Sequence, residues 1–200
     1  VLLGSYLQNP ARFRLLISSV EHSSVRDAAD FLRSSGAEVH ELPVLPTGEL
    51  DWPAFEKAIE RSPSLVSIMA ANNETGTIYP IGRIVELCRA KNIPVHVDAV
   101  QAFGKLSPEL WNQADFISIS AHKIGGPKGI GALIVKKGRQ LQAIHFGGAQ
   151  EIKRRGGTEN VTGILGFGGA AAERDLSGWD RIAGYRLEFE NRLQELEGVR

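Results

Sequence analysis

Ile117-Ser-Ile-Ser-Ala-His-Lys-Ile-Gly-Gly-Pro-Lys128 is an apolar run of strand length that leads directly into a His-Lys pair and a glycine-rich turn. A second apolar run, Ile93-Pro-Val-His-Val-Asp98, ends on an aspartate. Pyridoxal phosphate (PLP) needs an amine to hold its aldehyde and a carboxylate to keep its ring nitrogen protonated. A lysine and an aspartate at the ends of two separate strands therefore predict a PLP site.

On both sides of this stretch, apolar runs alternate with segments whose apolar residues recur with a helical period. We expect strands over residues 14–19, 37–42, 65–70, 94–98, 115–120 and 131–136, and helices over residues 23–35, 51–61, 81–91, 159–173 and 177–197. Strand–helix repetition of this kind is typical of an α/β fold with a mostly parallel sheet and helices on both faces.

Polar side chains follow four of the predicted strands. In chain order they are His22, then Asn73, then Asp98 with Gln101, then Ser120 with His122 and Lys123. Ligands of open parallel sheets bind beyond the carboxyl ends of the strands. We therefore expect these side chains to converge on one edge of the sheet, with Lys123 and His22 as the chemically active residues.

Each of these residues also has a plainer interpretation. Asp98 could cap the next helix, and a loop lysine is usually a solvated charge. His22 alone would be an ordinary histidine at a helix start, although in this set it can lie on a pyridine ring and move protons. Residues 125–129 could form a simple turn or a close backbone approach to a ligand. The pairing of Asp98 with Lys123 favours the cofactor interpretation.

The segment Arg154-Arg-Gly-Gly-Thr-Glu-Asn160 has two compatible interpretations. Thr158 can be the N-cap of the helix predicted to begin at residue 159. The same hydroxyl, beside free backbone amides and arginines, can also bind an anion such as phosphate.

Composition excludes several classes of protein. Lys plus Arg and Asp plus Glu both number 23, so no net charge attracts nucleic acid or a membrane surface. No apolar run reaches the length of a membrane-spanning helix. The single cysteine, Cys88, excludes an internal disulfide framework and favours a reducing, cytoplasmic compartment. Its apolar helical neighbours indicate a buried residue rather than a nucleophile, and His96 is likewise expected to be structural.

Five ordered motifs resemble the cysteine desulfurases of the NifS/IscS type, PLP enzymes of the class V aminotransferase group with fold type I. The motifs are Val-Glu-His22-Ser-Ser-Val, Ala71-Asn-Asn-Glu-Thr-Gly-Thr, His96-Val-Asp-Ala-Val-Gln, Ser120-Ala-His-Lys-Ile-Gly-Gly-Pro-Lys-Gly-Ile-Gly and Arg155-Gly-Gly-Thr-Glu-Asn. The resemblance extends from about residue 14 to about residue 175 of the printed sequence.

The resemblance implies a role for each candidate residue. Lys123 would bind the aldehyde covalently, Asp98 would bond the ring nitrogen, Gln101 would reach the ring hydroxyl oxygen, and His22 would stack on the ring. Ser120 and His122 would bind the phosphate, Asn73 would lie beside cofactor and substrate, and Thr158 would reach the phosphate in the neighbouring subunit of a homodimer. Such an enzyme removes sulfur from L-cysteine, leaves a protein persulfide and alanine, and supplies an iron–sulfur scaffold or tRNA thiolation.

The resemblance also implies what this chain does not supply. Residues 1–175 would be an N-terminally incomplete PLP-binding large domain, and residues 176–200 a helix leading toward a small C-terminal domain. The upstream phosphate loop, the nucleophilic cysteine and the substrate-binding arginine of the family have no counterpart here, so we expect the chain alone to be inactive. The alternatives are another class V PLP enzyme, such as a selenocysteine lyase or an aminotransferase, or a non-catalytic scaffold.

Overall fold

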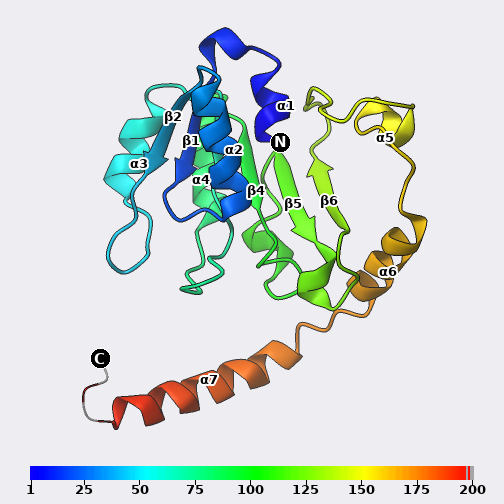
Figure 1. Cartoon of the computed structure of the whole chain (residues 1–200). Coiled ribbons are helices and arrows are strands. Elements are labelled where there is room, and N and C mark those ends of the chain that lie inside the picture. The colour runs from blue at the N-terminus through cyan, green and yellow to red at the C-terminus, as the bar shows by residue number, and fades with distance from the viewer. Residues whose placement is uncertain (197, 199–200) are drawn as a thin grey trace.

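The computed structural model describes residues 1–196 and residue 198, and it is built on one six-stranded sheet (Figure 1). The strands are β1 (Arg14–Ser18), β2 (Glu38–Leu42), β3 (Leu65–Ser67), β4 (Val95–Asp98), β5 (Phe116–Ser120) and β6 (Gly131–Val135), in the spatial order β2-β1-β3-β4-β5-β6. Neighbours among the first five strands pair in parallel, and β6 pairs antiparallel with β5. The predicted mostly parallel sheet is confirmed.

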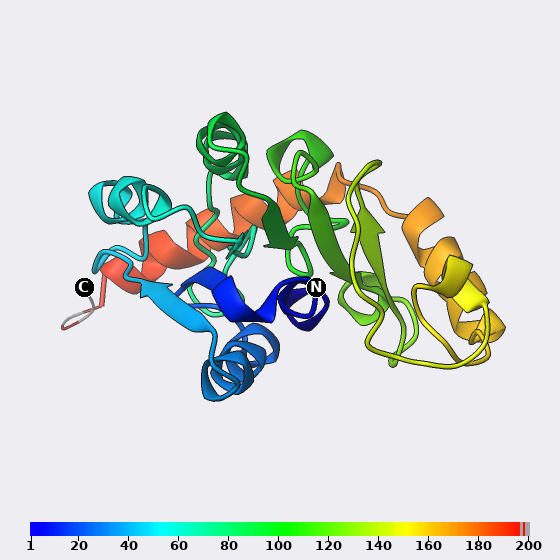
Figure 2. The same ribbon diagram turned by 90° about the horizontal axis from the view of Figure 1, so that it is seen from above.

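Helices cover both faces of this sheet, as the sequence predicts. They are α1 (Leu2–Tyr6), α2 (Ser23–Ser34), α3 (Trp52–Ile59), α4 (Ile81–Ala90), α5 (Gln150–Lys153), α6 (Val161–Ala172) and α7 (Gly178–Gln194), with short 3-10 segments η1 (Pro10–Arg12), η2 (Pro108–Leu110) and η3 (Ala121–Ile124). Figure 2 shows α2 on one side of the sheet and α3 with α4 on the other. None of the helices in the described part of the chain has the length and apolar character needed to cross a membrane.

Two apolar clusters hold these layers together. Along β1, Leu16 packs into the cluster shared with α3 and α4, whereas Leu15 and Ile17 pack into the cluster shared with α1 and α2. Alternate side chains of a strand point to opposite faces, so a strand covered on both sides is mostly apolar. This explains why apolar residues predominate in the central strands, whereas the buried polar residues Ser67 and His96 form hydrogen bonds with each other.

The order of the strands creates a switch point between β1 and β3. From β1 the chain moves outward to β2, and it then returns to the other side of β1 and continues through β3, β4 and β5. Connections on either side of such a point leave in opposite directions and open a crevice at the carboxyl ends of the strands. The residues that follow β1, β3, β4 and β5 therefore surround one edge, beyond which α7 lies in Figure 1.

Asp115 stabilises the end of the sheet opposite the carboxyl ends of the strands. Its carboxylate accepts hydrogen bonds from the backbone N–H of Val95 and from Nε of Arg139, both at 2.9 Å, and the residue is 8% exposed. Removing this buried carboxylate leaves the Val95 N–H and the Arg139 guanidinium without their hydrogen-bond acceptor. Asp115→Ala should therefore lower the free energy of unfolding, measured in urea, by about 3 kcal/mol. The control Asp30→Ala removes an exposed ion pair to Arg33 and should cost under about 1 kcal/mol. Equal losses in the two variants would contradict this account.

The structure differs from the sequence prediction around α6 and α5. Thr158 does not cap α6, because the helix begins at Val161 and Asn160 Oδ1 accepts a hydrogen bond from the N–H of Gly163 at 3.0 Å. Asn is among the strongest N-cap residues, so Asn160 is preferred over Thr158 as the cap and the helix begins two positions later than predicted. In α5, Glu151, Ile152 and Lys153 have positive φ angles that no apolar pattern foretells. Residue 197, the predicted end of the last helix, lies outside the described residues.

Candidate active site

Asp98 and His22 lie close together beyond the carboxyl ends of β4 and β1. Asp98 Oδ1 accepts a hydrogen bond from the N–H of Val100 at 2.9 Å, so the capping interpretation holds for that oxygen. Burial raises the pKa of Asp98, although the hydrogen bond from Val100 and the proximity of His22 act in the opposite direction. The site therefore contains a half-buried carboxylate that a further cation would stabilise.

His22 is the N-cap residue of α2, at the helix start that its plainer interpretation predicts. Its Nδ1 accepts a hydrogen bond from the N–H of Ser24 at 3.2 Å and lies 2.9 Å from the hydroxyl of the same residue. An Nδ1 atom that accepts leaves Nε2 as the protonated nitrogen. The ring is exposed, so its face and its Nε2–H are available beside Asp98.

Ser120, His122 and Lys123 follow directly from β5. Ser120 ends the strand, and His122 and Lys123 lie on η3, which stops at Gly125 with a φ of +83°. Ser120 Oγ is 2.7 Å from Nδ1 of His122, and the side chains of His122 and Lys123 are exposed. Because Asp98 pairs with Ser118 across the ladder, Ser120 lies one pleat further along the neighbouring strand.

The turn after β3 separates its two asparagines. Asn72 is buried and holds the turn, since its Oδ1 accepts from the N–H groups of Glu74 and Thr75, both at 2.9 Å. Its Nδ2 donates to the carbonyl of Val20 at 3.2 Å, which ties this turn to the segment that carries His22. Asn73 is exposed beside it. Asn72 therefore stabilises the turn, and the contact of Asn73 with cofactor and substrate stays a prediction.

Glu21 is a site residue that the sequence analysis missed. It precedes His22, is 4% exposed, and its Oε1 accepts from Ser18 Oγ at 2.6 Å and from the N–H of Met69 at 2.8 Å. Burial raises the pKa of Glu21 to about 8, against the lowering effect of these two bonds, and the nearby Asp98 raises it further. Oε2 is buried and has no partner in the described part of the chain. A pKa above 7 favours the neutral acid of Glu21 at pH 7, and Oε2, which has no hydrogen bond there, is the oxygen free to carry the proton.

Glu21→Gln should make the protein more stable than the parent as the pH rises. The unfolded carboxyl ionises near 4.5 and the folded one near 8, so between these values folding takes up a proton and stability falls with rising pH. Glutamine has no such proton. The difference in unfolding free energy should grow in favour of the variant by roughly 1 kcal/mol per pH unit between pH 5 and pH 8.

Urea unfolding at several pH values measures this difference. Glu86→Gln, at an exposed position of α4, is the matched control and should leave the pH profile of the parent unchanged. A constant difference between Glu21→Gln and the parent from pH 5 to pH 8 would show that Glu21 is ionised in the fold.

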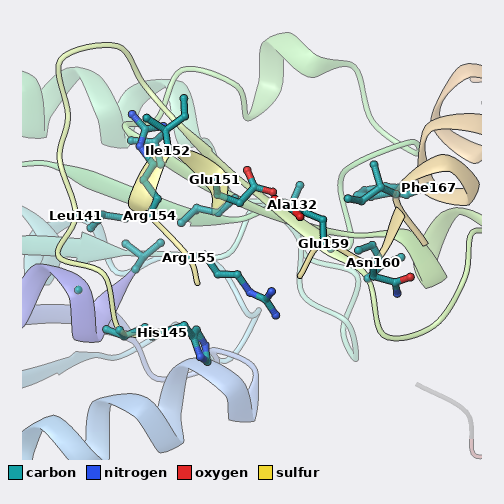
Figure 3. A pocket seen from close by; sticks show the side chains of 18 of the residues that line it. Ala132, Leu141, His145, Glu151, Ile152, Arg154, Arg155, Glu159, Asn160 and Phe167 are labelled. Atoms are coloured by element: carbon teal, nitrogen blue, oxygen red, sulfur yellow. The ribbon is translucent and has the colours of Figure 1, made fainter. Parts of the chain in front are cut away.

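Thr158 lies apart from the other predicted residues. It lines a cavity of about 710 Å³ between β6 and the segment that carries α5 and α6. In Figure 3, Ile152 and Arg154 lie at one end of this cavity and Asn160 and Phe167 at the other. Asp98, Gln101 and Lys123 do not line it. Within one chain, Thr158 therefore belongs to a different surface, and its predicted contact with phosphate in a neighbouring subunit stays a prediction.

Two further titratable residues have structural surroundings. Cys88 is fully buried on α4, and burial raises the pKa of its thiol to about 12, with a smaller contribution from Asp115. His96 bridges three strands, since Nδ1 is 2.8 Å from Ser67 Oγ and Nε2 is 2.9 Å from Ser118 Oγ. Burial lowers the pKa of His96 to about 3. Neither side chain is available for chemistry at the edge of the sheet.

The residues at this edge fit PLP by their chemistry. Asp98 is a half-buried carboxylate suited to a ring N–H, and Lys123 carries an exposed amine suited to an aldehyde. The hydroxyl of Ser120 and the imidazole of His122 offer donors to a phosphate, and the amide of Gln101 offers one to a ring oxygen. Each polar group of the cofactor thus has a complementary group on this chain.

Comparison with known proteins gives consistent results. A family model described as aminotransferase class V matches residues 5–196. A cysteine desulfurase from Sinorhizobium fredii is 43% identical over 188 residues, which cover 93% of this chain and 48% of that protein. Among solved structures, a NifS-like protein matches with a TM-score of 0.86 and 32% identity, covering 97% of this chain and 54% of that one. A structure of SspA in complex with cysteine matches with a TM-score of 0.77 and 32% identity, covering 92% and 58%. The chain spans about half the length of the curated relatives that it matches.

Proposed function

The chain belongs to the class V aminotransferase family, and from this premise we propose that it forms the PLP-binding part of a cysteine desulfurase of the NifS/IscS type. The observation that carries the proposal is the arrangement of Asp98 and Lys123 at one sheet edge, in a chain that is 40–44% identical to curated cysteine desulfurases. A neighbour whose structure is titled as a complex with cysteine supports the choice of substrate.

Four groups of this chain would hold the cofactor. The amine of Lys123 would bind the aldehyde carbon, and the carboxylate of Asp98 would accept the hydrogen bond of the ring N–H. Ser120 and His122 would donate to the phosphate, and the Gln101 amide would donate to the ring hydroxyl oxygen. His22 would stack on the ring, with Asn73 beside the substrate. Thr158 would serve the phosphate of the partner subunit in a homodimer.

PLP, when bound, withdraws electrons from the Cα of an attached amino acid. Asp98 would make this possible by accepting a hydrogen bond from the ring nitrogen and favouring its protonated form. The exposed amine of Lys123 would hold the cofactor and, when not bonded to it, could accept a proton from the Cα of the substrate and return it. His22 would offer Nε2 as a second proton carrier. It follows β1, whereas Lys123 follows β5, so the two residues lie on opposite sides of the strand β4 that carries Asp98.

The sulfur must pass to a thiol. Attack of a thiolate on the cysteine sulfur breaks the carbon–sulfur bond, leaves a persulfide on the attacking thiol and yields alanine after protonation. Cys88, the one cysteine of this sequence, is a poor acceptor, because it is buried and its pKa is raised to about 12. We therefore assign residues 1–175 to cofactor binding and residues 176–200 to a connection toward a small domain, and we place the acceptor thiol outside this chain.

The proposed enzyme would work in the cytoplasm, where thiols stay reduced. Its partners would be a second copy of itself and a protein that takes up the persulfide sulfur, such as an iron–sulfur scaffold. The same persulfide sulfur could equally be used for tRNA thiolation.

The full-length protein that contains this chain tests the proposal. With PLP, L-cysteine and a reducing thiol, we expect equal amounts of alanine and sulfide, and Lys123→Ala should abolish both. Transfer of the amino group to a keto acid would identify an aminotransferase instead, and activity confined to selenocysteine would identify a selenocysteine lyase. Absence of any reaction with all three substrates would support a scaffold.

A further inference from the structure

The segment after β4 places a second lysine in the candidate site. Residues 99–106 form a helical turn in which the N–H of Phe103 donates to the carbonyl of Ala99 at 2.8 Å. Gln101 and Lys105 are four residues apart on this turn, so their side chains lie on the same side. Nζ of Lys105 donates to Oε1 of Gln101 at 2.5 Å.

This contact fixes the orientation of the Gln101 amide. An ammonium group donates hydrogen bonds and cannot accept them, so it can face only the oxygen of a side-chain amide. The NH₂ group of Gln101 must then point away from Lys105. Without Lys105, a rotation about the last side-chain bond would exchange the oxygen and the nitrogen at little cost.

Lys105 is also held near Lys123. Gly104 packs against Ile124, the neighbour of Lys123: with φ at +75°, a Cβ on Gly104 would lie 2.5 Å from Cγ2 of Ile124. Burial lowers the pKa of Lys105, and the positive charge of Lys123 lowers it further. The 99–106 turn and η3 therefore lie against each other, and Lys105 and Lys123 are near enough for their charges to interact.

Two neighbouring cations repel each other, and a nearby anion offsets that repulsion. Among the side chains that the structure describes, Lys105 forms no ion pair with a carboxylate. Its one polar side-chain partner there is Gln101, the residue proposed to reach the ring oxygen of PLP. A negatively charged ring oxygen would satisfy both lysines and the amide.

We infer that Lys105 is a positioning residue for the cofactor: it aims the N–H groups of Gln101 at the ring hydroxyl oxygen of PLP and stabilises negative charge on that oxygen. This inference rests on the proposed function, since it needs PLP at the sheet edge. It assigns to Lys105 a role through Gln101 and not a contact with the reacting carbon.

The first test needs no cofactor. In ¹⁵N-labelled protein, the side-chain NH₂ signals of Gln101 report its environment directly. Lys105→Met should shift these signals, and Lys105→Arg, which keeps a donor-only cation, should restore them toward the parent. Lys137→Met is the matched control, because Lys137 is exposed beyond β6, and it should leave them unchanged. Gln101 signals that are identical in Lys105→Met and the parent would overturn the positioning role.

The second test compares PLP with 3-deoxypyridoxal phosphate, which lacks the ring hydroxyl. Loss of a charge-assisted contact should weaken PLP binding by about tenfold in Lys105→Met and shift the pH midpoint of the visible absorbance change. The same substitution should have no effect on binding of the deoxy analogue, and no further effect in a Gln101→Met background. Equal losses for both cofactors would mean that Lys105 acts only on general stability or charge, and would overturn the inference.

The outcomes separate this inference from the proposed function. If the parent binds PLP through Lys123 and Lys105→Met binds both cofactors as the parent does, the inference fails and the proposed function stands. If the parent binds no PLP, both fail.

Discussion

Replacing Lys123 by alanine should abolish the visible absorbance band that we expect when PLP is added to the protein. A bond between a lysine amine and the PLP aldehyde absorbs at about 410–430 nm when protonated, and free PLP in the same buffer provides the baseline. Lys123 is exposed on η3, so its removal should leave the fold intact. Spectra of the dialysed protein, with and without PLP, give the result directly.

Lys128→Ala is the matched control for this substitution. Lys128 lies five residues further along the same glycine-rich segment and is also exposed. We expect its removal to keep the band. A band that survives in Lys123→Ala would assign the aldehyde to another amine. A band that disappears equally in both variants would show that its loss is not specific to Lys123.

Asp98→Asn should weaken PLP binding by about a hundredfold. The substitution keeps the shape of the side chain and the hydrogen bond from the N–H of Val100, but it removes the charge that holds the ring nitrogen protonated. A partly buried charge-assisted hydrogen bond contributes roughly 3 kcal/mol, which corresponds to that factor. Titration of the protein with PLP, followed by absorbance, measures the dissociation constant.

Asp27→Asn makes the same chemical change at an exposed position of α2 and should leave the affinity within about twofold of the parent. If Asp98→Asn behaves like this control, Asp98 serves only as the cap of the 99–106 turn. A loss of affinity in Asp98→Asn accompanied by a fall in unfolding free energy below that of Asp27→Asn would point to the same structural role.

The fold follows largely from local pattern. The central strands are rich in apolar residues because helices cover both faces, and this makes β1, β3, β4 and β5 visible in the sequence. What the pattern does not contain is the direction of β6, since an apolar strand is compatible with either pairing. The left-handed turn at residues 151–153 and the cap at Asn160 depend on single residues and on tertiary context, so the sequence analysis misplaced the start of α6.

Site residues that directly follow a strand could be predicted from the sequence, whereas those that depend on tertiary packing could not. Strand ends place His22, Asp98 and Lys123 at one edge, because parallel strands deliver their next residues to the same side. Glu21 was missed because the burial of an acid depends on the packing of β1 against β3, which its sequence neighbours do not reveal. Lys105 could have been found, since its spacing of four residues from Gln101 is a helical-turn signal once that turn is recognised.

The most direct test of the account is to identify which amine of the protein holds PLP. Borohydride reduction makes the bond between a lysine and the PLP aldehyde permanent, and peptide mapping by mass spectrometry then locates the modified residue. We predict modification of Lys123 in the peptide that contains Ser120 and His122, with Lys105, Lys128 and Lys137 unmodified. Modification at another lysine, or modification spread evenly over exposed lysines, would contradict the assignment of this sheet edge as a PLP site.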